Sequence, residues 1–111
     1  MHPFITLFIA IICEVAATLS LKFSDGFTRI TPSSVAVLGY ATSAYFLAIT
    51  LKHGMPIGIA YAIWAGMGTA SVVLFGALFW KETLSLYQII AILVIVLGVI
   101  ALNLVSESAH G

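Results

Sequence analysis

One carboxylate, Glu14, stands inside a long apolar stretch and is the residue best placed to do chemistry. Between Pro3 and Leu21 there is no lysine or arginine to pair with it. A carboxylate at membrane depth must be protonated, face water or bind a cation. We therefore interpret Glu14 as a site where protons and a cation compete, which is the physical basis of antiport. The alternative is a neutral buried glutamate that is hydrogen-bonded to a neighbouring hydroxyl.

Helical spacing places several small and apolar residues on the face of Glu14. Small side chains on this face would let another helix or a ligand approach closely. Phe4 lies near the mouth of the same segment, where it could bind a ligand or anchor the interface. The candidate pocket on this face comprises Leu7, Ala10, Ile11, Ala17 and Thr18.

Aromatic residues in two other segments could complete a cation site. Tyr61 and Trp64 share one helical face, and an aromatic face attracts an organic cation. Tyr40 and Ser43 also share a face, and Tyr40 could stack on a ligand and hydrogen-bond the Glu14 carboxylate. Ordinary packing would explain these residues as well. Two glycines further along the third segment, Gly66 and Gly68, suggest a helix kink.

The composition shows which elements must position these residues. Of the 111 residues 62% are hydrophobic and only 7% are charged, and the mean hydropathy is +1.21, which excludes a water-soluble domain. The charged residues delimit four uninterrupted apolar stretches, apart from Glu14 itself. We therefore predict an all-α integral membrane protein with one domain over residues 1–111. Its membrane-spanning helices are expected at about residues 4–21, 33–51, 57–80 and 86–105.

Other classes of site find no support in the residue pattern. The three histidines, His2, His53 and His110, have no metal-ligand spacing, and no nucleophile–base constellation, phosphate loop or basic patch is visible. We expect no enzyme activity, no cofactor, no metal and no nucleic-acid partner.

The basic residues give almost no orientation signal. Lys52 falls on one side of the membrane, and Lys22, Arg29 and Lys81 fall on the other, so the chain could insert either way round. Four helices enclose little space, so a transport site requires an oligomer, and two inverted copies would resemble the inverted repeats of larger transporters. In the fourth segment Ala91 and Gly98 are seven apart and favour helix association, although the face could simply contact lipid.

The order of motifs along the whole chain resembles the small multidrug resistance family. Glu14 is followed by LKFSDGFTR at residues 21–29, Pro-Ser at 32–33 and GIAYAIWAGMG at 58–68. The resemblance implies an antiparallel homodimer in the inner membrane that exchanges protons for hydrophobic cations. It assigns the proton and the drug to Glu14, drug stacking to Trp64, and the pocket lining and coupling to Tyr40 and Tyr61.

Within that family the sequence is similar to the branch that exports quaternary ammonium compounds and dyes. It lacks the tryptophan shortly after the glutamate that is typical of guanidinium exporters. Two departures concern packing: Ala17 and Ala91 stand where glycines are often found. Export of guanidinium, and a non-transporting membrane subunit whose Glu14 pairs with a partner's cation, remain as alternatives.

Overall fold

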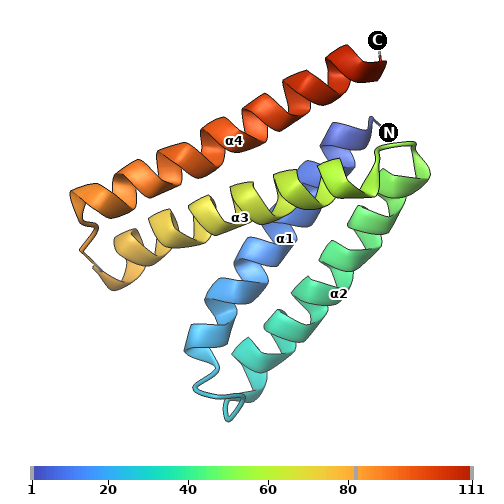
Figure 1. Cartoon of the computed structure of the whole chain (residues 1–111). Helices are drawn as coiled ribbons and strands as arrows, with labels where there is room; N and C mark the ends of the chain where they lie inside the picture. The colour runs from blue at the N-terminus through green and yellow to red at the C-terminus, as the bar shows by residue number, and fades with distance from the viewer. Residues whose placement is uncertain (1, 82, 111) are drawn as a thin grey trace. The chain divides into compact units, whose positions relative to one another are not determined.

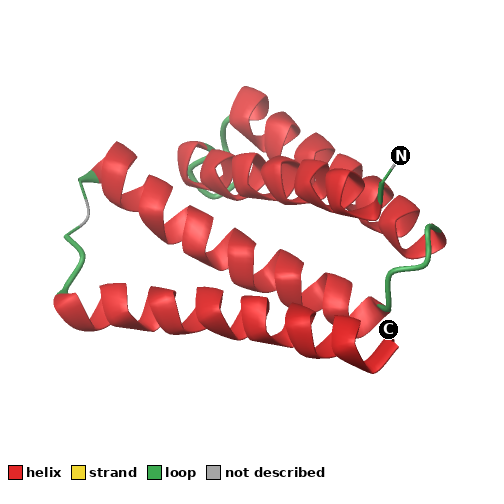
Figure 2. Cartoon of the chain, turned by 90° about the horizontal axis from the view of Figure 1, so that it is seen from above, coloured by secondary structure: helices red, strands yellow, loops and turns green. Residues whose placement is uncertain are grey.

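The computed structural model describes the backbone of residues 2–81 and 83–110 and the side chains of residues 2–81 and 83–106. Within these ranges the chain consists of helices joined by short loops, as Figures 1 and 2 show. Each helix contains a segment that is long and apolar enough to cross a membrane. The helices are α1 (Pro3–Phe23), α2 (Ile30–Lys52), α3 (Ile57–Trp80) and α4 (Leu86–His110).

Two helix boundaries differ from the predicted ones. The second helix begins at Ile30, ahead of the predicted start at 33, and takes Pro32 into its first turn. Proline is tolerated there because the first amides of a helix have no intrahelical acceptor. The fourth helix continues to His110, beyond the predicted end at 105. No glycine or proline separates Gly98 from Gly111, so nothing in the sequence stops the helix earlier.

The chain forms two compact units, each of which is a helical hairpin. The first unit, Met1–Pro56, contains α1 and α2, and the second, Ile57–Gly111, contains α3 and α4. In Figure 1 the two helices of the first hairpin run antiparallel along each other. The single domain expected over residues 1–111 stays a prediction.

A glycine on α2 lets the first hairpin close tightly. A Cβ built at Gly39 would lie 2.8 Å from the Cβ of Ala17 and 3.2 Å from the carbonyl oxygen of Cys13, both on α1. Near the other end of the hairpin, the hydroxyls of Thr6 and Thr50 are 2.7 Å apart and fully buried. Backbone contact in the middle and a hydrogen bond at the end therefore fix α1 against α2.

The loop between α1 and α2 is organised around the buried residue Ser24. Its Oγ donates to the carbonyl of Leu21 at 2.6 Å and accepts from the amide of Phe27 at 3.2 Å. Asp25, Gly26 and Phe27 all have positive φ angles, of 50°, 70° and 69°. Only glycine adopts positive φ angles freely, so a chain turn that also places Asp25 and Phe27 in this conformation is stabilised by the hydrogen bonds of Ser24.

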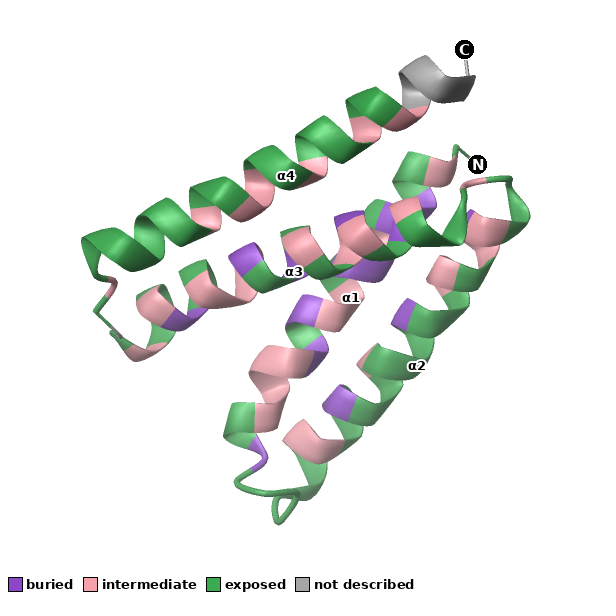
Figure 3. Cartoon of the chain, in the orientation of Figure 1, coloured by how far each residue is buried: buried purple, intermediate pink, exposed green. Residues whose placement is uncertain are grey.

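The second hairpin has its own close approach. Gly66 lies against the side chains of Val99 and Ile95, so any Cβ at this position would collide with α4. The helix α3 runs through Gly66 and Gly68 without a break, and the kink expected there stays a prediction. On α4, Gly98 faces open space, because a Cβ built there meets nothing within 4 Å. Figure 3 shows exposed residues along α4 as far as residue 105.

Candidate functional site

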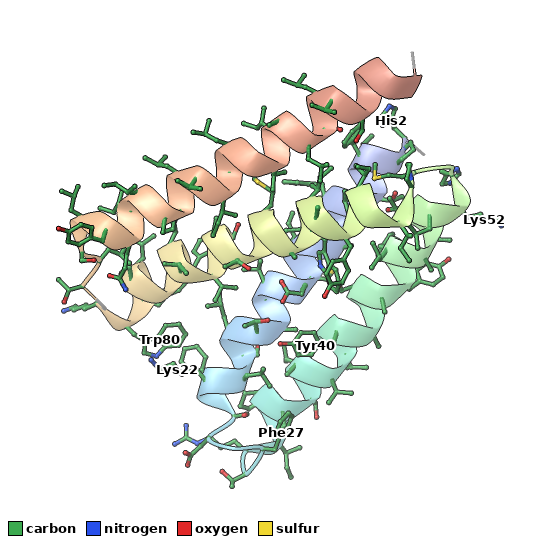
Figure 4. All side chains as sticks on the ribbon, in the orientation of Figure 1. His2, Lys22, Phe27, Tyr40, Lys52 and Trp80 are labelled. Carbon is green, nitrogen blue, oxygen red and sulfur yellow. The ribbon has the colours of Figure 1, made fainter. Side chains whose placement is uncertain are left out.

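Glu14 lies at one end of a short chain of hydroxyl groups. One turn further along α1, the Oγ1 of Thr18 donates to Glu14 Oε1 at 2.9 Å. The same Oγ1 lies 2.7 Å from the phenolic oxygen of Tyr40 on α2. In Figure 4 the ring of Tyr40 extends from α2. The hydrogen bond of Tyr40 thus goes to Thr18, through which the phenol is connected to the carboxyl group.

The direction of these hydrogen bonds follows from the number of protons. The Thr18 hydroxyl has one proton, and while that proton is donated to Glu14, Thr18 can only accept from Tyr40. An ionised Glu14 therefore orders the series Tyr40 to Thr18 to Glu14. A protonated Glu14 can donate to Thr18, which frees the Thr18 proton for Tyr40 and reverses both bonds. The Tyr40 hydroxyl can thus take a different orientation in each charge state of Glu14.

Other predicted pocket residues are buried in the structure. Ser43 on α2 donates its hydroxyl to the carbonyl of Ala10 on α1 at 2.7 Å, and both residues are buried. Ala17 is fully buried with its Cβ directed at Gly39. Leu7 and Ile11 are buried as well. Ser43, Ala10 and Ala17 thus hold the first hairpin together and fix the backbone that presents Glu14.

The aromatic candidates of the second hairpin contact each other. The rings of Tyr61 and Trp64 are 5.5 Å apart at their centroids and meet edge to face, at 81°. Tyr61 is 58% exposed. The indole Nε1 of Trp64 is buried and has no hydrogen-bond partner among the described residues. A buried N–H donor without an acceptor is costly.

Three features of the first hairpin were not predicted from the sequence. They are the role of Gly39 opposite Ala17, the buried pair Thr6 and Thr50, and the contacts of His2 at the start of α1. A glycine or a threonine in an apolar helix indicates close packing only when the facing residue is known. Helical periodicity could have found the faces, but not their pairing across the hairpin.

Comparison with known proteins agrees with the all-helical membrane fold. The family model described as Small Multidrug Resistance protein matches residues 2–95. The chain is 46% identical to the quaternary ammonium compound-resistance protein QacF of Klebsiella aerogenes and 41% identical to QacE of Escherichia coli. Both alignments cover 99% of this chain and 100% of the relative. The multidrug resistance protein mmr of Mycobacterium leprae is 41% identical, over 91% of this chain and 94% of its own.

These relatives are named for resistance and not for catalysis. Family and relatives cover nearly the whole chain, and all four helices that the structure describes have the length and composition of membrane spans. The chain is therefore a multi-pass membrane protein that belongs to the small multidrug resistance family.

Proposed function

We propose that this protein exports hydrophobic and quaternary ammonium cations, including dyes, across the inner membrane in exchange for protons. The names of QacE and QacF support the class of substrate. The observation that carries the mechanism is the hydroxyl series that ends on Glu14, within a helix that has no lysine or arginine between Pro3 and Leu21. A carboxyl group in this setting can hold a proton or a cation, but not both.

Thr18 and Tyr40 are proposed to couple the two states of Glu14. With a cation bound, Glu14 is ionised and accepts from Thr18, and the Tyr40 hydroxyl points toward Thr18. When a proton displaces the cation, Glu14 becomes a donor and the series can reverse. The Tyr40 hydroxyl then turns toward other acceptors. Loss of the cation at α1 is thereby communicated to α2.

Aromatic rings are proposed to supply the remaining affinity for the cation. Tyr61 and Trp64 meet edge to face, which leaves ring faces available to a ligand. A cation over such a face gains about 0.5 to 2 kcal/mol, more when water is excluded. The Trp64 N–H, which has no acceptor among the described residues, can bind a carboxylate or a substrate acceptor in the assembled protein.

The working unit is proposed to be an antiparallel homodimer with dual topology. The nearly even distribution of lysine and arginine leaves both orientations accessible. The outer face of α4, with Ala91 and Gly98 exposed, is the candidate dimer contact. Two inverted copies would bring two Glu14 residues to one shared site. A site of this kind can open to either side of the membrane by exchanging the conformations of its halves.

Proton release tests the proposal directly. We expect the purified protein to release protons when a quaternary ammonium ion such as benzyltriethylammonium is added, and the Glu14→Gln variant to release none. Asp25→Asn removes a carboxylate in the loop between α1 and α2 and should release protons like the native chain. Release from Glu14→Gln, or its absence from the folded native dimer, would contradict the proposal. A response to guanidinium but not to the bulkier ion would support the guanidinium exporter instead.

A further inference from the structure

Among the described residues, His2 provides the acceptors for the first backbone amides of α1. Its Nδ1 accepts from the amide of Phe4 at 3.1 Å. Its carbonyl oxygen accepts from the amides of Ile5 at 2.9 Å and Thr6 at 3.3 Å. Pro3, the first helical residue, has no amide proton to satisfy. The first amides of a helix lack intrahelical acceptors, and within the described part of the chain His2 supplies them at this end of α1.

The same imidazole also holds the ring of Phe4. The two rings are stacked, with centroids 5.5 Å apart and planes within 19°. Phe4 is 41% exposed, and the imidazole of His2 covers part of its ring. By helical spacing Phe4 lies on the face of Leu7, Ile11 and Glu14, about 15 Å from Glu14 along the axis. His2 therefore sets the position of the aromatic ring at the outer end of this face.

We propose that His2 is a positioning residue for the cation pathway: neutral His2 holds Phe4 in place, and protonation of the imidazole releases it. This inference rests on the proposed function for its readout in transport. A protonated imidazole has two N–H donors and no acceptor, so its Nδ1 can no longer bind the Phe4 amide. Its positive charge also lies at the positive end of the α1 dipole and beside the path of a cation.

The groups around His2 bear on the pH dependence. The hydrogen bond between Thr6 and Thr50 shows that the C-terminal end of α2 packs beside this end of α1. The ionisable groups at that end of α2 are Lys52 and His53, and no carboxylate occurs in residues 30–56. Figure 4 labels His2 and Lys52 at these ends of the hairpin. Protonated His2 adds positive charge to an end of the hairpin where the ionisable groups of α2 are basic.

Two substitutions separate the acceptor from the ring. His2→Asn keeps a capping acceptor but does not titrate, and His2→Phe keeps a ring but has no acceptor. The KM for benzyltriethylammonium is measured in proteoliposomes from about pH 5.5 to 8, the range in which histidine changes charge. Protons and the cation compete at Glu14 in the native protein and in His2→Asn alike, so this pH effect cancels when the native KM is divided by the KM of His2→Asn. His53→Asn, at the neighbouring helix end, is the matched control.

We expect the KM ratio to rise about 2- to 10-fold as the pH falls, the size of effect that loss of a helix N-cap produces. The ratio of His2→Phe to His2→Asn should stay constant with pH, and His53→Asn should follow the native chain. Hydrogen exchange of the Phe4 amide gives a readout that is independent of transport. Its protection should fall at low pH in the native protein and persist in His2→Asn.

Each result decides between the inference and the function on which it rests. A native-to-variant KM ratio that does not change with pH overturns the positioning role, even if the Phe4 amide loses protection. Equal pH dependence in His53→Asn and His2→Asn overturns it too. If the native protein fails to transport the cation, the proposed function fails. The Phe4 amide then still shows whether protonation of His2 opens the first turn of α1.

Discussion

Replacing Thr18 by valine tests whether its hydroxyl couples Glu14 to Tyr40. Valine has nearly the shape of threonine, so the helix packing is retained while both hydrogen bonds are lost. The ionised carboxylate loses a donor at 2.9 Å, and the Tyr40 hydroxyl loses its acceptor at 2.7 Å. A cation must then compete with the proton for a carboxylate that is less well stabilised in its ionised form. We expect cation binding to weaken.

The size of the effect follows from the type of bond. A hydrogen bond to a charged group contributes about 1.5 to 3 kcal/mol, which corresponds to about 10- to 100-fold in affinity. Glu14 and Thr18 are only half-buried, so water can partly replace the lost donor. The lower end of this range applies. The dissociation constant for benzyltriethylammonium should therefore rise about tenfold at neutral pH.

Isothermal titration calorimetry in detergent at several pH values measures the affinity and the number of protons released. Thr18→Ser keeps the hydroxyl and should bind within about twofold of the native chain. Tyr40→Phe keeps the donor to Glu14 and removes only the outer phenol, so its affinity should fall less than that of Thr18→Val. Native affinity in Thr18→Val would refute the coupling, because the hydroxyl would then make no difference to Glu14.

Two further predictions concern the hairpins. Gly39→Val should push α1 and α2 apart, because its Cβ would lie 2.8 Å from the Cβ of Ala17. We expect the free energy of unfolding, measured by reversible unfolding in denaturant, to fall by about 1 to 3 kcal/mol. Native stability would show that the close contact is dispensable. The side chain added in Gly98→Val meets open space within the chain, so this variant should leave each hairpin intact but weaken dimerisation, as measured by analytical ultracentrifugation. Gly66→Val should instead disturb the packing on Val99. An unchanged dimerisation constant in Gly98→Val would exclude this face of α4 as the dimer contact.

The sequence was sufficient for the helices because charge and apolar length are local properties. Lys22, Lys52 and Lys81 lie at or next to the ends of α1, α2 and α3, so the scarcity of charged residues alone marks these ends. The prediction of four apolar helices is confirmed for the described residues, and so is the family. The start of α2 lies earlier than predicted because a proline in the first turn is compatible with helix, although the pattern suggested a boundary.

Contacts across the hairpin could not be predicted, because they depend on the register of α1 against α2. The spacing of Tyr40 and Ser43 placed both residues on one face; it assigned no partner to Ser43, and for Tyr40 it suggested the carboxylate of Glu14. In the observed register the hydroxyl of Ser43 hydrogen-bonds the carbonyl of Ala10, and the hydroxyl of Tyr40 hydrogen-bonds Thr18. Ala17 illustrates the same limit. Ala17 stands where a glycine is often found, and its methyl group is accommodated by the absence of a side chain at Gly39.

The register also determines which part of the proposed mechanism belongs to a single copy of the chain. The series from Tyr40 to Glu14 lies wholly within the first hairpin, as do the contacts that hold the hairpin together. Each copy in a dimer can therefore report the charge of its own Glu14 without help from its partner. Two copies that carry different charges would then differ in their Tyr40 orientation. An inequality between two otherwise identical subunits is what alternating access requires, and the Thr18 hydroxyl is the group that would create it.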